Sequence, residues 1–162
     1  MQNENARKSK QAVLFFGALT FFAVATFISL YEGSQLDDIS WEWPYSAVFT
    51  NWFSGGVTSA DDILTIDYLV YSAKFEPLFP LIMFVSGMIL FLQLSFWIFR
   101  GKKIVWSVFL LLCATALLVL SGALMASPTD GLELFSKFFL GTGILIVIFT
   151  ASWLIKARKL PS

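Results

Sequence analysis

Four long apolar stretches limit what this chain can fold into. None of them contains an acidic residue, and Lys137 is the only basic residue inside them. A helix of about 21 residues rises roughly 31 Å, which matches the hydrocarbon core of a bilayer. Because lipid offers the backbone no hydrogen-bonding partner, such stretches form helices. The sequence therefore predicts transmembrane helices over residues 11–31, 78–99, 104–125 and 135–155, with a loop over 32–77.

The composition excludes several other classes of protein. Hydrophobic residues make up 57% of the chain, so the helices of a soluble bundle, which need a polar face, do not fit. The chain has no histidine, the commonest metal ligand and the usual general base near neutral pH. Cys113 is the single cysteine and allows neither an internal disulfide nor a thiolate metal cluster. We therefore expect no catalytic residue, no cofactor, no metal site and no nucleic-acid partner, since a basic patch is also lacking.

The first apolar stretch has one feature of a secretory signal, because Arg7, Lys8 and Lys10 precede it. It is, however, longer than the apolar core of a usual signal peptide. The residues from Tyr31 to Ser34 offer no cleavage site of the small-x-small kind. We therefore expect an uncleaved membrane anchor.

The charged residues predict how the helices are oriented. Ten of the eleven acidic residues lie between the first and second stretches or between the third and fourth. Nine of the eleven basic residues lie at the opposite ends, and loops rich in lysine and arginine stay in the cytoplasm. Both biases predict a multi-pass protein of the cell membrane with its N- and C-termini in the cytoplasm and loop 32–77 outside. The nine basic residues are Arg7, Lys8, Lys10, Arg100, Lys102, Lys103, Lys156, Arg158 and Lys159.

The connections fit this topology. Residues Arg100 to Lys103 form a tight turn, which predicts an antiparallel hairpin of the second and third helices. The segment Ser127–Gly131 is typical of a turn before the fourth helix. Pro77 and Pro80 fall in the first turn of the second helix, where a missing amide proton costs little. The predicted fold is an all-α membrane protein, an antiparallel bundle of four transmembrane helices.

The first half of the loop is rich in aromatic residues. Tryptophan and tyrosine favour the headgroup level of a bilayer, so one interpretation seats this segment on the outer membrane interface. Aromatic residues also dominate protein interfaces, so the second interpretation is a docking surface. In either case we expect an ordered loop close to the membrane rather than a flexible tether. The candidate interface residues are Trp41, Trp43, Tyr45, Phe49, Trp52 and Phe53.

The second half of the loop shows weaker helical signals. Gly55 and Gly56 break the chain, and Ser59 is placed to cap a short helix that begins at Ala60. Apolar residues then recur near helical spacing, which favours an amphipathic helix on the bundle or on the membrane surface. The period is irregular, so a partly extended form stays open. These apolar residues are Ile63, Ile66, Leu69 and Val70.

Three strings around this loop, YEGS (31–34), WEWPYSAVFT (41–50) and DYLVYSAKFEPLFP (67–80), carry a resemblance. They resemble the YjdJ-like small membrane proteins of Bacillus-type bacteria, a family of unknown function. The resemblance covers about residues 31–90. It implies a Gram-positive plasma membrane and supplies no activity, substrate or catalytic residue.

The leading functional prediction is a non-enzymatic accessory or scaffold protein that associates with other membrane proteins or with itself. The helices hold no ionisable group at mid-membrane depth, and small residues on their faces permit close packing, in the first place within the chain. These small residues include Gly17, Gly87, Gly122, Gly141 and Gly143.

Two other classes of function stay open. An oligomeric channel or transporter subunit would use polar side chains at membrane depth, such as Gln93. A membrane enzyme would use carboxylates near the outer boundary, where desolvation raises a pKa; these are Glu32, Asp67 and Glu76. The acidic pairs at 37–38 and 61–62 lack the spacing of a calcium loop, so we expect them to be solvated charge.

Overall fold

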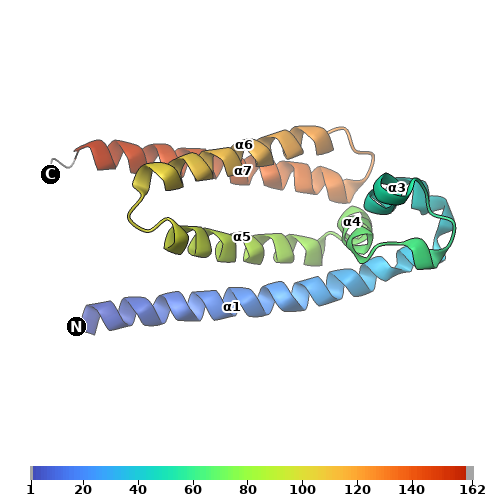
Figure 1. The fold of residues 1–162 in the computed structure, drawn as a ribbon, viewed down its shortest axis with the longest axis horizontal. Coiled ribbons are helices and arrows are strands. Elements are labelled where there is room, and N and C mark those ends of the chain that lie inside the picture. Colours follow the sequence, from blue (N-terminus) through green and yellow to red (C-terminus); the bar gives the residue numbers. More distant parts are fainter. Residues whose placement is uncertain (1, 160–162) are drawn as a thin grey trace. The chain divides into compact units, whose positions relative to one another are not determined.

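The computed structural model describes residues 2–159 and the side chains of residues 5–155. Over these residues all regular structure is helical (Figure 1). Contacts divide the chain between Gln93 and Leu94 into two compact units. The elements, with 3-10 helices written η, are α1 (Gln2–Gly33), η1 (Ser34–Asp38), η2 (Ser40–Glu42), α2 (Trp43–Ser46), α3 (Val48–Ser54), η3 (Ala60–Asp62), α4 (Thr65–Phe75), α5 (Leu78–Ile98), α6 (Lys103–Leu124) and α7 (Asp130–Lys159).

Helices α1, α5, α6 and α7 are long and apolar enough to cross a membrane, as predicted. The bounds of α5 and α6 agree with the predicted 78–99 and 104–125 within one residue at each end. α1 and α7 extend beyond the apolar stretches because an uninterrupted helix satisfies its own backbone in water as well as in lipid. The four apolar helices therefore indicate a multi-pass membrane protein. The packing of these helices as one bundle and their orientation in the membrane stay predictions. The basic residues Lys156, Arg158 and Lys159 lie outside the described side chains.

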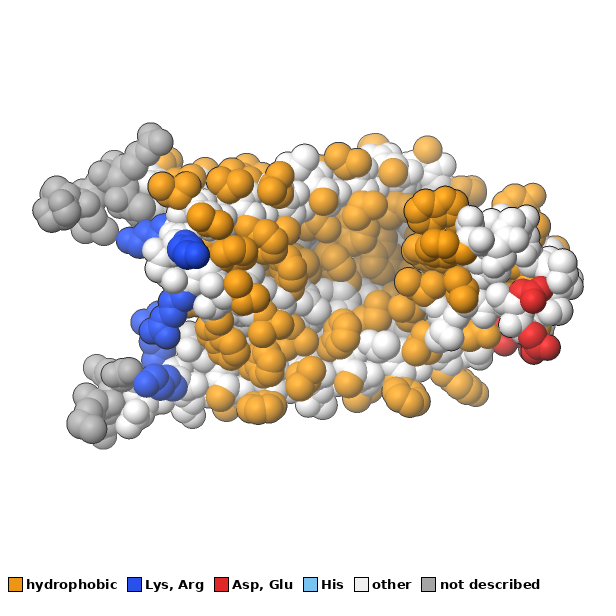
Figure 2. All heavy atoms as spheres, in the orientation of Figure 1, with side chains coloured by type: hydrophobic (Ala, Val, Ile, Leu, Met, Phe, Trp, Pro, Cys, Tyr) orange, Lys and Arg blue, Asp and Glu red, His pale blue; other side chains and the backbone are white. Residues whose placement is uncertain are grey.

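The surface of α1 exposes large apolar side chains, as expected of a helix surrounded by lipid. Phe16, Phe21 and Phe27 each leave more than half of their area exposed, which water would disfavour. Figure 2 shows hydrophobic side chains along the helices, basic ones near the N-terminal end of α1 and acidic ones beyond its other end.

In the second unit, α6 and α7 form an antiparallel pair with small residues at their contact. Ser121 Oγ donates to the carbonyl of Ser136 at 2.8 Å, and Ser136 Oγ donates to the carbonyl of Ser121 at 2.8 Å. Further along, a Cβ atom added to Gly143 would lie 3.0 Å from Leu118 and 3.3 Å from the carbonyl oxygen of Ala114. Close backbone approach of this kind is how membrane helices associate.

The remaining small residues divide into two groups. In the first unit, a Cβ atom at Gly87 would lie 3.1 Å from the ring of Phe22, so this glycine also serves internal packing. A Cβ atom at Gly17, Gly122 or Gly141 would meet no described heavy atom within 4 Å. Internal packing by small residues is thus confirmed at Gly87 and Gly143.

The two short turns of the second unit are as tight as predicted. Gly101 has φ +86°, a left-handed conformation that glycine adopts at little cost, between α5 and α6. The turn predicted over 127–131 ends earlier, because Asp130 already begins α7, where its negative charge faces the positive helix end. Thr129 N–H donates to Ser127 Oγ at 3.4 Å within this turn.

The segment between α1 and α5 is folded, and we call residues 34–75 the loop subdomain. Its helices are short and separated by at most two residues, except for the break after α3. There Gly55 takes φ +76° and ends α3, as the glycine pair predicts. A small apolar cluster holds the pieces together and consists of Leu36, Ala47, Ile63 and Tyr71, with Ile39, Trp43, Val57 and Tyr68 packed against it.

The helix predicted from Ala60 onward is split, so the partly extended alternative is the one observed. Asp62 caps η3 by accepting hydrogen bonds from the N–H groups of Thr58 and Ser59, both at 3.0 Å. The chain is then extended at Ile63 and Leu64, and α4 begins only at Thr65. The extension follows from packing, because Ile63 enters the apolar cluster.

Helix α4 crosses the end of α1 in direct backbone contact (Figure 1). A Cβ atom added to Gly33 would collide with the carbonyl group of Tyr68. Because these atoms belong to the backbone, no side-chain rotation relieves the clash. Gly33 therefore sets how closely the loop subdomain is held to the first span.

We expect Gly33→Ala to lower the stability of the full chain by about 1–3 kcal/mol, the usual cost of overpacking. Gly17→Ala is the matched control in the same helix, because its added methyl meets no described atom within 4 Å. The thermal unfolding midpoint in detergent, followed by tryptophan fluorescence, measures the difference. Equal midpoints for the two variants would contradict the close crossing.

Candidate functional site

The carboxylate of Asp67 lies fully buried against the N-terminus of α3. Its Oδ1 accepts a hydrogen bond from the backbone N–H of Phe49 at 2.8 Å. Its Oδ2 accepts bonds from the N–H of Thr50 at 2.9 Å and from Thr50 Oγ1 at 2.6 Å. Thr50 Oγ1 accepts in turn from the N–H of Leu64 at 2.9 Å. A charged side chain of α4 thus caps a helix that precedes it in the sequence.

Helix α3 needs this cap because its own N-cap residue is Ala47, whose methyl group accepts no hydrogen bond. The first N–H groups of a helix have no partner inside the helix and carry a partial positive charge. The carboxylate of Asp67 supplies acceptors and the opposite charge at once. The arrangement explains how a carboxylate is accommodated in the interior of so small a unit.

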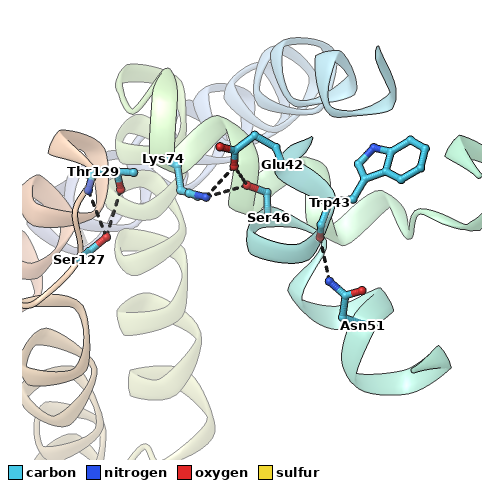
Figure 3. Close-up of polar contacts among 7 residues, drawn as sticks. All are labelled: Glu42, Trp43, Ser46, Asn51, Lys74, Ser127 and Thr129. Carbon is cyan, nitrogen blue, oxygen red and sulfur yellow. Dashed lines mark hydrogen bonds and ion pairs between the residues drawn. The ribbon is translucent and has the colours of Figure 1, made fainter. Parts of the chain in front are cut away.

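A second buried polar group joins α4 to η2 and α2 (Figure 3). Lys74 Nζ lies 3.1 Å from Glu42 Oε2, with the lysine side chain 9% exposed. Ser46 Oγ accepts from Lys74 Nζ at 2.7 Å and donates to Glu42 Oε2 at 2.7 Å. Burial raises the pKa of Glu42, but the hydrogen bonds from Ser46 and Lys74 together with the lysine charge outweigh it, so the pKa lies below its ordinary value. The Glu42 carboxylate is therefore ionised at neutral pH.

Two contacts tie α4 to α1 and η1. The hydroxyl of Tyr68 donates to the carboxylate of Asp37, with distances of 2.8 and 2.9 Å to its two oxygens. Burial, then the hydrogen bond to Asp37, raises the pKa of Tyr68 to about 12, so the hydroxyl keeps its proton and remains a donor. One helical turn later, Ser72 Oγ lies 3.4 Å from Glu32 Oε2 at the end of α1.

The candidate aromatic residues do not share one environment. Trp43 is half-buried against the apolar cluster, and its Nε1 donates to the carbonyl of Leu36 at 2.9 Å. Its own carbonyl accepts from Asn51 Nδ2 at 2.8 Å (Figure 3). Phe49 is half-buried as well. The other four are exposed, namely Trp41 at 70%, Tyr45 at 71%, Trp52 at 77% and Phe53 at 71%.

Several carboxylates considered for chemistry have structural partners. Asp67 caps α3, and Asp37 binds Tyr68. Asp62 accepts from Thr58 Oγ1 at 2.6 Å, and the hydrogen bonds from Thr58 hold the pKa of Asp62 below its ordinary value. Among the residues with described side chains, no group of three or more His, Cys, Asp or Glu residues is placed to hold a metal ion. Asp67, Asp37 and Asp62 thus each take part in the hydrogen bonds that hold the loop subdomain together.

The roles of Lys74 and Thr50 were not predicted from the sequence. For Lys74 there was a signal, since it is the only basic residue between Lys10 and Arg100. A lone base in an acidic loop favours an ion pair. For Thr50 there was none, because its contact with Asp67 joins residues that are 17 positions apart.

We expect Asp67→Asn to destabilise the loop subdomain by roughly 2–3 kcal/mol, because the amide NH₂ would face the N–H donors of α3. Asp61→Asn is the control, since this exposed neighbour should change stability by less than about 0.5 kcal/mol. The rate of proteolytic cleavage between α3 and α4, measured on the full chain in detergent, reports the difference. If the Asp67 variant resists the protease as well as the control does, the cap contributes nothing.

Comparison with known proteins places this subdomain in a family. A family described as "Domain of unknown function (DUF4306)" matches residues 12–99, which hold most of α1, the loop subdomain and α5. The uncharacterized protein YjdJ of Bacillus subtilis (strain 168) is 29% identical over 91 residues, or 55% of this chain and 83% of that protein. No solved structure matches the chain. α6 and α7 lie outside the family match. The resemblance found in the sequence is confirmed, and the chain belongs to this DUF4306 family of unknown function.

Proposed function

We propose that the chain is a non-enzymatic accessory protein of a bacterial plasma membrane, which holds its loop subdomain against another membrane protein. The observation that carries this proposal is that the buried charged groups of the subdomain are committed to its own fold. Asp67 holds α3, and Lys74 and Glu42 hold α2 against α4. The loop subdomain therefore presents a preorganised surface. Preorganisation lowers the entropic cost of association.

We further propose that the loop subdomain lies outside the cell and that both termini lie in the cytoplasm. Support comes from α1, whose N-terminal end carries Arg7, Lys8 and Lys10. The subdomain at its other end is strongly acidic, with Lys74 as its single base. This distribution agrees with the retention of basic segments in the cytoplasm.

The exposed acids indicate what kind of partner would fit. Asp38 and Asp61 are exposed, and neither is needed for a described side-chain hydrogen bond within the subdomain. A surface with such carboxylates is complementary to a basic one, and charge complementarity accelerates and orients association. We therefore propose that the partner presents lysine or arginine residues at its outer face.

Site-specific photo-crosslinking in native membranes tests this proposal. A photoreactive residue replaces exposed Thr65 on α4, and the control probe replaces Val13 on the apolar face of α1. We expect one reproducible adduct with a membrane protein from the Thr65 probe. Because the proposed contact is electrostatic, the double variant Asp38→Asn with Asp61→Asn should weaken the adduct severalfold.

Two results would contradict the proposal. The first is that the Thr65 probe captures only abundant proteins, in the same pattern as the Val13 probe, across several growth conditions. The second is that the adduct forms equally well in the double variant, which would mean that the exposed acids take no part in the contact.

A further inference from the structure

Helices α2 and α3 are inverted in the sense that they bury polar side chains and expose aromatic ones. Two of their polar residues, Ser46 and Thr50, are fully buried, whereas the aromatic side chains of Tyr45 and Trp52 are exposed. Val48, one turn before Trp52 on α3, is 48% exposed and extends the same apolar face. A helix that lies on water has the reverse arrangement.

The inversion is stable because the interior satisfies the polar side chains. Ser46 bonds Glu42 and Lys74, and Thr50 bonds Asp67. Because Ser46 and Thr50 occupy the inner face, the rings of Tyr45 and Trp52 lie on the outer face. Moving such a ring from water into an apolar medium is favourable, so the exposed face favours a medium other than bulk water.

The absence of charged residues from α2, α3 and the residues that follow them indicates which medium the exposed face favours. No Asp, Glu, Lys or Arg occurs from Trp43 to Ala60, although acids flank the segment on both sides at Glu42 and Asp61. Protein interfaces carry a polar rim with charged groups, whereas the bilayer interface selects uncharged segments with tryptophan and tyrosine. The uncharged, inverted pair of helices fits the second environment.

The attachment of the subdomain places these helices within reach of the bilayer surface. Gly33 ends the first span in backbone contact with α4, and Leu36, three residues later, accepts the hydrogen bond from Trp43 Nε1. After α4, only Glu76 and Pro77 separate the subdomain from α5. Both ends of the subdomain thus join membrane spans directly. Phe27 and Tyr31, on the last turns of α1, are exposed as well.

We propose that α2 and α3 form an interfacial anchor, with Trp41, Tyr45, Trp52 and Phe53 seated among the lipid headgroups and upper acyl chains. The anchor does not rest on the proposed protein partner, which would use the acidic residues instead. In this arrangement the membrane covers the apolar side of the subdomain, and Asp38 and Asp61 remain in water.

Fluorescence quenching in nanodiscs tests the anchor. The purified full chain, one copy per disc of phosphatidylglycerol and phosphatidylethanolamine, carries Cys113→Ala and a single bimane-labelled cysteine at Val48 or at Asp61. Iodide should quench the Val48 probe at least about fivefold less than the Asp61 probe, because headgroup seating keeps this face out of bulk water. Lipids spin-labelled near the headgroup should quench the Val48 probe and leave the Asp61 probe unaffected.

A variant that lacks two of the four exposed aromatic residues tests whether these side chains hold the segment at the membrane. Replacing Trp52→Ser and Phe53→Ser together should raise iodide quenching at Val48 toward the Asp61 value, while the unfolding midpoint in detergent stays unchanged, since neither side chain is buried. Equal iodide quenching at Val48 and Asp61 in the parent chain would overturn the anchor. With no other protein in the disc, that result would leave the aromatic face exposed to water and open to a protein partner.

Discussion

The contact between Gly33 and the backbone of Tyr68 positions α4, and the rest of the loop subdomain depends on α4. From this one helix, Asp67 reaches α3, Tyr68 reaches η1 and Lys74 reaches α2. A unit this small buries too little apolar surface to be stable through hydrophobic contact alone. Its attachment to a membrane span at Gly33 removes part of the conformational freedom that folding would otherwise have to overcome.

The polar interior and the aromatic exterior of the subdomain are two aspects of one arrangement. A buried charge is costly unless it is paired and hydrogen bonded, and Asp67, Glu42 and Lys74 each have such partners. Where Ser46 and Thr50 fill the inner faces of α2 and α3, Tyr45, Trp52 and Phe53 face outward. An exterior of this kind is stable where the surroundings are lipid, which agrees with four helices that are long and apolar enough to span a membrane.

The spans were predictable because their signal is local, a run of apolar residues whose length matches a bilayer. The cap at Ser59 was also predictable, and the irregular apolar period left an extended form open. The position of the break at Ile63 was not predictable, since it depends on the apolar cluster that this side chain enters. The six aromatic residues look alike in sequence, and only the rotational phase of short helices places Trp43 inward and Trp52 outward. The bond between Asp67 and Thr50 is likewise non-local, so no spacing rule could find it.

Hydrogen–deuterium exchange on the full chain in nanodiscs tests most directly whether the loop subdomain is a cooperative folded unit. Amides with stable hydrogen bonds exchange only when the structure around them opens, so protection reports the free energy of opening. We expect slow exchange for peptides covering α3 and α4, and faster exchange at both when Asp67 is replaced, because its carboxylate joins the two helices. Complete exchange of both helices within seconds in the parent protein would instead show that the loop is a flexible tether.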